Sequence, residues 1–203
     1  MHLLNTLLKA LPEYQTLKER SEQNIPCAIT GLSAIHRAHM TAALHQDTGR
    51  QVLVVCQDDL ATARMAEELS GFLGEKPPVL PTRELCLLGG TVSRGWEQQR
   101  LSMLYQLTQG GYPVLLASAE ALSLRTMPPS VLGANTISLV VGGSYQLDAL
   151  IQRLTALGYR RSTLVEGAGQ FALRGGILDV YSPAAPAPVR VEFWGDELDS
   201  MGY

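Results

Sequence analysis

The segment at residues 30–36, Thr-Gly-Leu-Ser-Ala-Ile-His, has the position of a phosphate-binding loop, since it joins a predicted strand to a predicted helix. Such a loop needs glycine amides around the phosphates, a lysine for their charge and a hydroxyl residue for magnesium. Only Thr30 and Gly31 match, and Ala34 and Ile35 stand where the lysine and the hydroxyl residue should follow. Phosphoryl transfer depends on those missing groups, so we expect no ATP hydrolysis, no catalytic residue and no cofactor in this chain.

Two other groups of residues could hold a metal ion. His36 and His39 stand three residues apart on a predicted helix, a spacing that two metal ligands could use. Asp196, Glu197 and Asp199 form an acidic run after a predicted strand, where a divalent cation could bind. The histidines have no acidic or cysteine partner nearby to complete a set. We therefore expect a solvated helix face, a solvated turn and no metal site.

The composition is typical of a folded protein from a reducing compartment. Of the 203 residues, 46% are hydrophobic and 17% are charged, which suffices for a core and is too little charge for a disordered chain. The net charge of −3 gives no overall attraction to DNA or to an anionic membrane. Cys27, Cys56 and Cys86 are widely spaced and are expected to be buried thiols. The first residues resemble neither a signal peptide nor a membrane span, so we expect a cytoplasmic protein with no membrane partner.

Apolar runs alternate with helical patterns in the first two thirds of the chain. This pattern predicts a parallel sheet covered on both faces, and we interpret residues 1–135 as a degenerate, P-loop-like α/β domain without a working phosphate loop. The predicted strands are residues 25–30, 51–56, 113–118 and 136–141, and the predicted helices are residues 33–47, 59–72 and 95–109.

The pattern changes after Gly142 and Gly143. A short helical pattern at residues 148–157 is followed by short alternating runs separated by glycine and proline, which is typical of β-hairpins. We place a second, smaller α+β domain with antiparallel β-hairpins at residues 136–203. We expect this domain to be truncated at its carboxyl-terminal end, because the chain stops soon after a strand.

Alternation along two of these strands assigns side chains to opposite faces, because successive residues of a strand point in opposite directions. The residues predicted to face the core are Leu178, Val180, Val189, Val191 and Phe193, and those predicted to point outward are Ile177, Asp179, Tyr181, Arg190, Glu192 and Trp194.

The outward face carries the residue types that most often anchor protein interfaces. Arg190 and Trp194 share that face, and Tyr181 could lie close to them on the paired strand. Arg174 precedes a Gly-Gly bend and could extend the same patch or pair with an acid. Alternatively, Trp194 packs into the core of its own domain or covers an edge. We favour a protein-docking face over that alternative.

The same residues carry a family resemblance. FALRGGILDVYSP at residues 171–183 and VRVEFWGDELDS at residues 189–200 closely resemble the second domain of the excision-repair protein UvrB and of its relative, the bacterial transcription-repair coupling factor. With the α/β pattern and SMLYQL at residues 102–107, the similarity covers nearly the whole chain. UvrB has an intact phosphate loop and a long aromatic-rich hairpin. Here the lysine is missing and Trp96 is the only aromatic residue in the corresponding region, which favours the coupling factor's amino-terminal UvrB-like module.

The resemblance implies a partner and a binding site. In that family the second domain binds UvrA and recruits the excision machinery to RNA polymerase stalled at a lesion. The family's binding positions fall on Arg174, Arg190 and Trp194, although phenylalanine is also found at the last position. The resemblance further implies that the full-length protein is an ATP-dependent DNA translocase, which would contact RNA polymerase and DNA only through domains beyond residue 203.

Two other functional hypotheses stay open at the level of sequence. The chain could be a nucleotide-dependent DNA-remodelling enzyme related to UvrB, a hypothesis that the missing lysine at position 34 disfavours. It could also be a structural domain that shields the rest of a larger protein, a role that is compatible with docking. An acidic chain without an aromatic hairpin is expected to associate with DNA only weakly.

Overall fold

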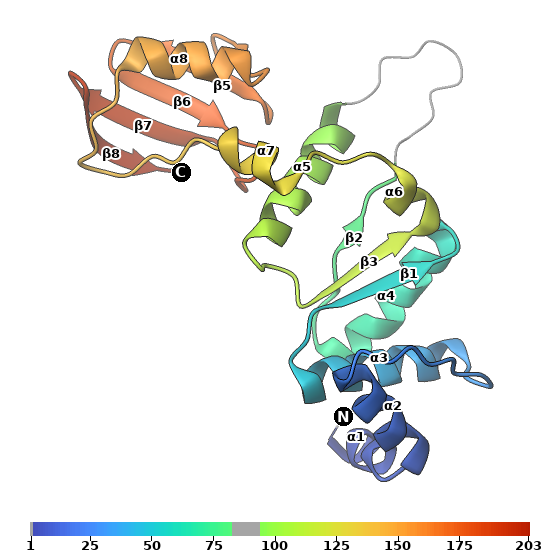
Figure 1. Cartoon of the computed structure of the whole chain (residues 1–203). Helices are drawn as coiled ribbons and strands as arrows, with labels where there is room; N and C mark the ends of the chain where they lie inside the picture. Colours follow the sequence, from blue (N-terminus) through green and yellow to red (C-terminus); the bar gives the residue numbers. More distant parts are fainter. Residues whose placement is uncertain (1, 83–93) are drawn as a thin grey trace, which may run out of the picture. The chain divides into compact units, whose positions relative to one another are not determined.

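A computed structural model describes residues 2–82 and 94–203 of the chain. The described residues form two compact units (Figure 1). The first unit comprises residues 2–82 and 110–125, and the second comprises residues 94–109 and 126–203. In the described parts of the chain, no helix is long and apolar enough to cross a membrane. The prediction for Cys86 lies outside the described residues, and the predicted domain boundary between residues 135 and 136 stays a prediction.

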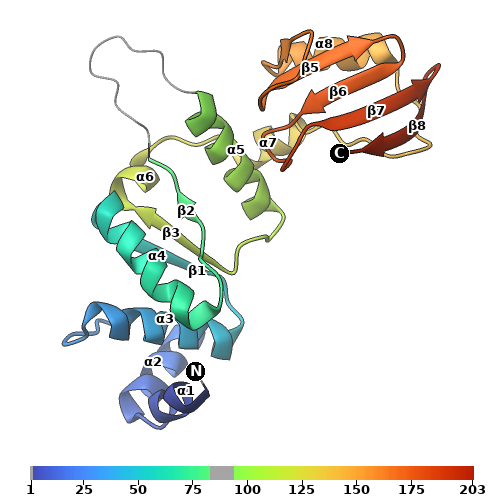
Figure 2. The same cartoon turned by 180° about the vertical axis from the view of Figure 1, so that it is seen from behind.

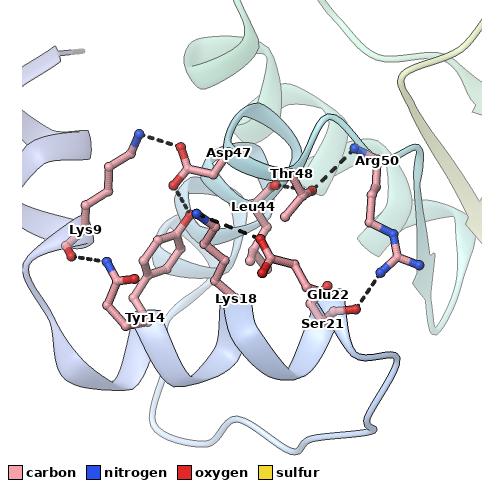
Figure 3. Close-up of polar contacts among 10 residues, drawn as sticks. Lys9, Tyr14, Lys18, Ser21, Glu22, Leu44, Asp47, Thr48 and Arg50 are labelled. Atoms are coloured by element: carbon pink, nitrogen blue, oxygen red, sulfur yellow. Dashed lines mark hydrogen bonds and ion pairs between the residues drawn. The ribbon is translucent and has the colours of Figure 1, made fainter.

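The first unit begins with helices α1 (His2–Lys9), α2 (Pro12–Glu22) and α3 (Ala34–Thr48). Pro12 stands in the first turn of α2, where its missing amide hydrogen has no partner to lose. The completely buried Tyr14 of α2 donates its hydroxyl proton to Asp47 of α3 at 2.9 Å, and Lys9 forms an ion pair with the same carboxylate (Figure 3). Arg50, just after α3, reaches the Ser21 carbonyl oxygen. These polar contacts attach the first two helices to the third.

Electrostatics favour the charged form of Asp47 in this arrangement. Burial by itself would raise the pKa of Asp47, but hydrogen bonds from Lys9 and Tyr14 and the positive charges of Lys9 and Lys18 hold that pKa below its usual value. Burial and the neighbouring carboxylate also raise the pKa of Tyr14, so its hydroxyl stays protonated and remains a donor.

A three-stranded parallel sheet forms the centre of the first unit. Its strand order is β1 (Val52–Cys56), β3 (Val114–Ser118), β2 (Val79–Leu80). Helix α4 (Asp59–Leu73) packs with α3 against this sheet, and the short α6 (Ala119–Ser123) follows β3 (Figure 2). The core between the helices and the sheet contains Ala38, Ala42, Ala66, Leu69, Val114 and Leu116.

The sequence predicted two of these strands and the helices α3 and α4 to within one or two residues, but the strand predicted at residues 25–30 is wrong. Those residues form no strand and are all exposed. Pro26 has no amide hydrogen for a strand ladder, and its carbonyl oxygen accepts a hydrogen bond from Arg20 at 3.0 Å. The prediction that the sheet is covered on both faces holds only in part, because Leu53 and Val55 of β1 are 51% and 54% exposed.

The second unit contains helices α5 (Arg94–Thr108), α7 (Pro129–Ala134) and α8 (Leu147–Ala156) and a mixed five-stranded sheet. The strands, in spatial order, are β4 (Arg160–Arg161), β5 (Gln170–Arg174), β6 (Ile177–Tyr181), β7 (Val189–Trp194) and β8 (Glu197–Gly202). Strand β4 is parallel to β5, and all other pairs are antiparallel. Helix α8 covers one face of the sheet (Figure 1), where the buried core consists of Leu150, Leu154, Phe171, Leu178, Val191, Phe193 and Leu198.

The assignment of side chains to the two faces of β6 and β7 is confirmed. All five residues predicted to face the core belong to the cluster beneath α8 or pack against it. Arg190, Glu192 and Trp194 are exposed. The residues on the core face of each strand could therefore be predicted from the alternation of side chains along the strand, which has a period of two residues.

The strand predicted at residues 136–141 is wrong. Ile137 and Leu139 pack against the core, but residues 136–141 form no ladder with a neighbouring strand. The amide of Val140 donates instead to the hydroxyl oxygen of Tyr145 at 2.9 Å. Pairing begins only in the turn that follows, where the amide of Gly142 donates to the carbonyl oxygen of Leu198 at 2.7 Å.

Candidate partner-binding face

The face of the β5–β8 sheet opposite α8 brings together the three predicted binding residues. We call it the outer face and define it by the outward side chains Arg174, Ile177, Asp179, Arg190, Glu192 and Trp194. In the register of the sheet, Arg174 pairs with Ile177, and Ile177 pairs with Glu192. Asp179 pairs with Arg190 in the next row on this face. The three predicted residues therefore occupy one surface, on β5 and β7 with β6 between them.

A two-residue turn, Gly175–Gly176, sets the register between β5 and β6. Gly175 has φ of +61°, a conformation that most residues with a side chain avoid. Gly176 lies so close to β7 that an added Cβ would come within 2.6 Å of the Phe193 carbonyl oxygen. The turn thus needs glycine at both positions, and it fixes Arg174 directly opposite Ile177.

Arg190 is held by a carboxylate on the neighbouring strand. Its Nε donates to one oxygen of Asp179 at 2.7 Å, and its Nη2 donates to the other at 3.0 Å. The hydrogen bonds from Arg190, opposed in part by burial, hold the pKa of Asp179 below its usual value, and the charges of Arg190 and Arg174 act in the same direction. Nε and one N–H of Nη2 face Asp179, so the donors left for a partner are the two N–H groups of Nη1 and the second N–H of Nη2.

Arg174 is anchored to a loop beside the sheet. Its Nη2 donates to the carbonyl oxygen of Thr163. At the other end of β5, the side-chain oxygen of Gln170 accepts from the amides of Glu166 and Gly167 at 2.9 and 3.3 Å. Outward side chains at both ends of β5 thus bind the loop at residues 162–169, which restricts the arginine.

Trp194 ends β7 and is 85% exposed. The alternative that it packs into the core of its own domain is therefore wrong. Its register partner is Glu197, across the turn to β8. A large aromatic side chain left this exposed offers apolar area and an indole N–H to a partner at a small cost in side-chain entropy.

Two features of the outer face were missed at the level of sequence. The pairing of Arg190 with Asp179 required the register of β6 and β7, which the loop between them, residues 182–188, does not reveal. Ile177 was predicted to point outward, but its position among the binding residues was not recognised; the Gly-Gly turn could have indicated it, since a two-residue turn pairs its flanking residues. Tyr181 is half-buried, and its hydroxyl donates to Pro186 at 3.2 Å.

The loop that was compared with a phosphate-binding loop precedes α3. Ser33 has the N-cap position, although its hydroxyl makes no capping hydrogen bond and lies 2.9 Å from Nδ1 of His36. Ala34 is the first helical residue, and Ile35 follows it. The loop therefore presents methyl and branched apolar side chains where the nucleotide chemistry would need ammonium and hydroxyl groups.

The histidines and cysteines differ partly from expectation. The ring of His39 stacks on Phe72 with centroids 4.8 Å apart, so only part of the predicted solvated helix face is solvated. Burial and the nearby His36 lower the pKa of His39. Cys27 is exposed and Cys56 is half-buried, so the prediction of buried thiols is wrong for Cys27. Among residues 2–82 and 94–203, no three histidine, cysteine or acidic side chains are grouped so that they could hold a metal ion.

Comparison with known proteins identifies the region that contains the outer face. Residues 137–203 match the UvrB interaction domain. Over most of its length the chain is also similar to proteins named transcription-repair-coupling factor. The chain is a homologue of these coupling factors. Identity is 36% over 180 residues to the protein from Myxococcus xanthus, which covers 84% of this chain and 15% of the relative.

Other bacterial coupling factors give the same result. The relative from Bacillus subtilis is 30% identical over 175 residues, covering 85% of this chain and 15% of the relative. The relative from Mycobacterium tuberculosis is 33% identical over 204 residues, covering 96% of this chain and 16% of the relative. The chain thus spans about a sixth of the length of these coupling factors. The first unit and the UvrB interaction domain are both included in the similarity.

Proposed function

We propose that this chain is a docking module that binds UvrA through the outer face of the β5–β8 sheet. The observation that carries the proposal is the placement of Arg174, Arg190 and Trp194 on one exposed surface of a UvrB interaction domain. Arginine and tryptophan are the residue types most enriched among interface hot spots. Both arginines are already restricted by contacts within the chain, which reduces the entropy lost on binding.

The role in the longer protein follows from this contact. By binding UvrA, the module would recruit the excision machinery to RNA polymerase that has stalled at a lesion. Contacts with the polymerase and with DNA, and ATP-driven translocation, would belong to other segments of the coupling factor. The module itself would carry out no catalysis, in keeping with Ala34 and Ile35 at the start of α3.

Calorimetric titration of purified UvrA with this chain tests the contact. We expect saturable binding by the parent chain and a large loss for the double variant Arg174→Ala/Arg190→Ala. Arg125→Ala is the matched control, since Arg125 is an exposed arginine in the first unit. If the double variant binds UvrA as tightly as the parent does, the binding site lies elsewhere on the chain. If the parent itself does not bind UvrA, the proposal is refuted.

A competition assay tests recruitment. In a reconstituted reaction with a full-length coupling factor, an excess of this chain should occupy UvrA and reduce repair of the transcribed strand. The Arg174→Ala/Arg190→Ala variant should not reduce it. Equal inhibition by both proteins would mean that the chain interferes by a route other than the outer face.

A further inference from the structure

Ile177 lies at the centre of the three proposed binding residues. It is the first residue of β6 and pairs with Arg174 on one side and Glu192 on the other. Arg190 and Trp194 stand two residues before and two residues after Glu192 on β7, with side chains on the same face. Directly paired residues have Cβ atoms about 5 Å apart, and diagonal ones about 7–8 Å apart. Ile177 is therefore a direct or diagonal neighbour of all three.

The side chain of Ile177 is 38% exposed, and the core of this unit lies on the other face of the sheet. It thus presents apolar surface among charged neighbours, with the exposed Trp194 on its diagonal. Interfaces are commonly built in this way, with an apolar centre that becomes dry on binding and a polar rim. Hot spots also concentrate near the centre, where surrounding contacts exclude water.

The charges around Ile177 restrict what can bind there. Arg174 lies beside it on β5, and Arg190 keeps the N–H groups that its bonds to Asp179 from Nε and Nη2 do not use. Glu192 accepts a hydrogen bond from Ser200 at 3.1 Å, so its carboxylate is partly satisfied within the sheet. The positively charged donors near Ile177 therefore belong to the two arginines, and they are complementary to carboxylates.

We propose that Ile177 receives an apolar side chain of UvrA that is flanked by acidic residues. The acidic residues would bind Arg174 and Arg190, and the apolar side chain would lie between Ile177 and Trp194. This inference rests on the proposed function and adds to it the chemistry of the partner surface. It assigns Ile177 to the centre of the interface.

Binding of UvrA by an Ile177→Thr variant tests the inference. Threonine keeps the branched Cβ that suits a strand and replaces the ethyl group of isoleucine by a hydroxyl, so the fold should be retained. We expect roughly a tenfold loss of affinity, because a polar group would be buried at the centre. Ile177→Val should bind within roughly threefold of the parent. Val140→Ala is the control for an exposed apolar side chain elsewhere in the second unit and should bind as the parent does.

The salt dependence separates the apolar contact from the ionic ones. The loss caused by Ile177→Thr should be the same at low and high salt, whereas the loss caused by Arg174→Ala should shrink at high salt because ionic attraction is screened. The inference is overturned if Ile177→Thr binds UvrA with the parent's affinity, or if its loss of affinity disappears at high salt. The proposed function then still stands, provided that Arg174→Ala and Trp194→Ala bind UvrA more weakly than the parent does. Normal binding by all of these variants would refute both.

Discussion

Arg190 and Asp179 face each other across β6 and β7, and both nitrogens on one edge of the guanidinium donate to the carboxylate, at 2.7 and 3.0 Å. The ion pair neutralises a carboxylate on the outer face and fixes the direction of the arginine. Free arginine side chains lose considerable rotational freedom when they bind a partner. Asp179 is thus expected to act as a positioning residue for Arg190.

Replacing Asp179 with alanine should weaken UvrA binding roughly fivefold, because Arg190 would then have to be ordered during binding. Arg190→Ala should cost more. If Asp179 acts only through Arg190, the double variant should bind no more weakly than Arg190→Ala alone, which isothermal titration of the four proteins would measure as a double-mutant cycle. Additive losses would instead show that Asp179 has its own contact with UvrA.

The attachment of α1 and α2 to α3 should depend on pH through Asp47. Its pKa is below the usual value in the folded chain, so the stability contributed by its charged form is present above about pH 4 and is lost as the pH falls through the lowered pKa. Asp47→Asn should lower stability by about 1 kcal/mol at pH 7 and by much less at pH 3. Hydrogen exchange of the α2 amides in both proteins at the two pH values measures the difference.

An exposed ion pair provides the control for this measurement. Lys76 and Glu67 are in contact, but both side chains are more than half exposed. Glu67→Gln should therefore change stability by less than about 0.5 kcal/mol at pH 7. If Asp47→Asn lowers the stability by the same amount at pH 3 and at pH 7, the charge of Asp47 does not have the proposed role.

Two groups of predicted strands show how far the fold can be predicted from the sequence. The faces of β6 and β7 were correctly predicted, because the alternating direction of side chains along a strand depends only on the local backbone. Residues 25–30 and 136–141 are also apolar, yet they are not strands. Burial or apolar character does not specify a hydrogen-bonding partner, and the amide of Val140 finds one in the side chain of Tyr145.

For the candidate site, the sequence indicated the residue types but not their relations. Arg174, Arg190 and Trp194 were selected by type, by alternation and by family resemblance, and the structure places them on one face. The pairing of Arg190 with Asp179 depends on the register of two strands separated by residues 182–188. The central position of Ile177 depends on two registers together, which local patterns do not contain.

ATP should not bind measurably to this chain. Ala34 and Ile35 at the start of α3 cannot neutralise phosphate or hold magnesium. Calorimetry with Mg-ATP is expected to show no saturable heat at micromolar to millimolar nucleotide. Saturable binding in the micromolar range would revive the alternative of a nucleotide-dependent enzyme related to UvrB.

The three proposed anchors give the most direct test of the docking face. Each of the single variants Arg174→Ala, Arg190→Ala and Trp194→Ala should bind UvrA roughly thirtyfold more weakly or worse, as is typical of hot-spot residues. Arg190→Glu should be worse than Arg190→Ala, because it adds repulsion of the acidic partner groups to the lost contact. Thermal melts of these variants should stay close to that of the parent, since the outward side chains contribute little to the core.

A core variant on the same strand distinguishes a lost contact from a lost fold. Phe193 alternates with the anchors on β7 but is buried beneath α8, and Phe193→Ala should destabilise the second unit by about 3–5 kcal/mol. Its melting temperature should fall sharply, whereas that of Trp194→Ala, one residue further along the strand, should not. If Trp194→Ala melts as Phe193→Ala does, Trp194 supports the fold. If all three anchor variants melt normally and still bind UvrA with the parent's affinity, UvrA docks on another surface.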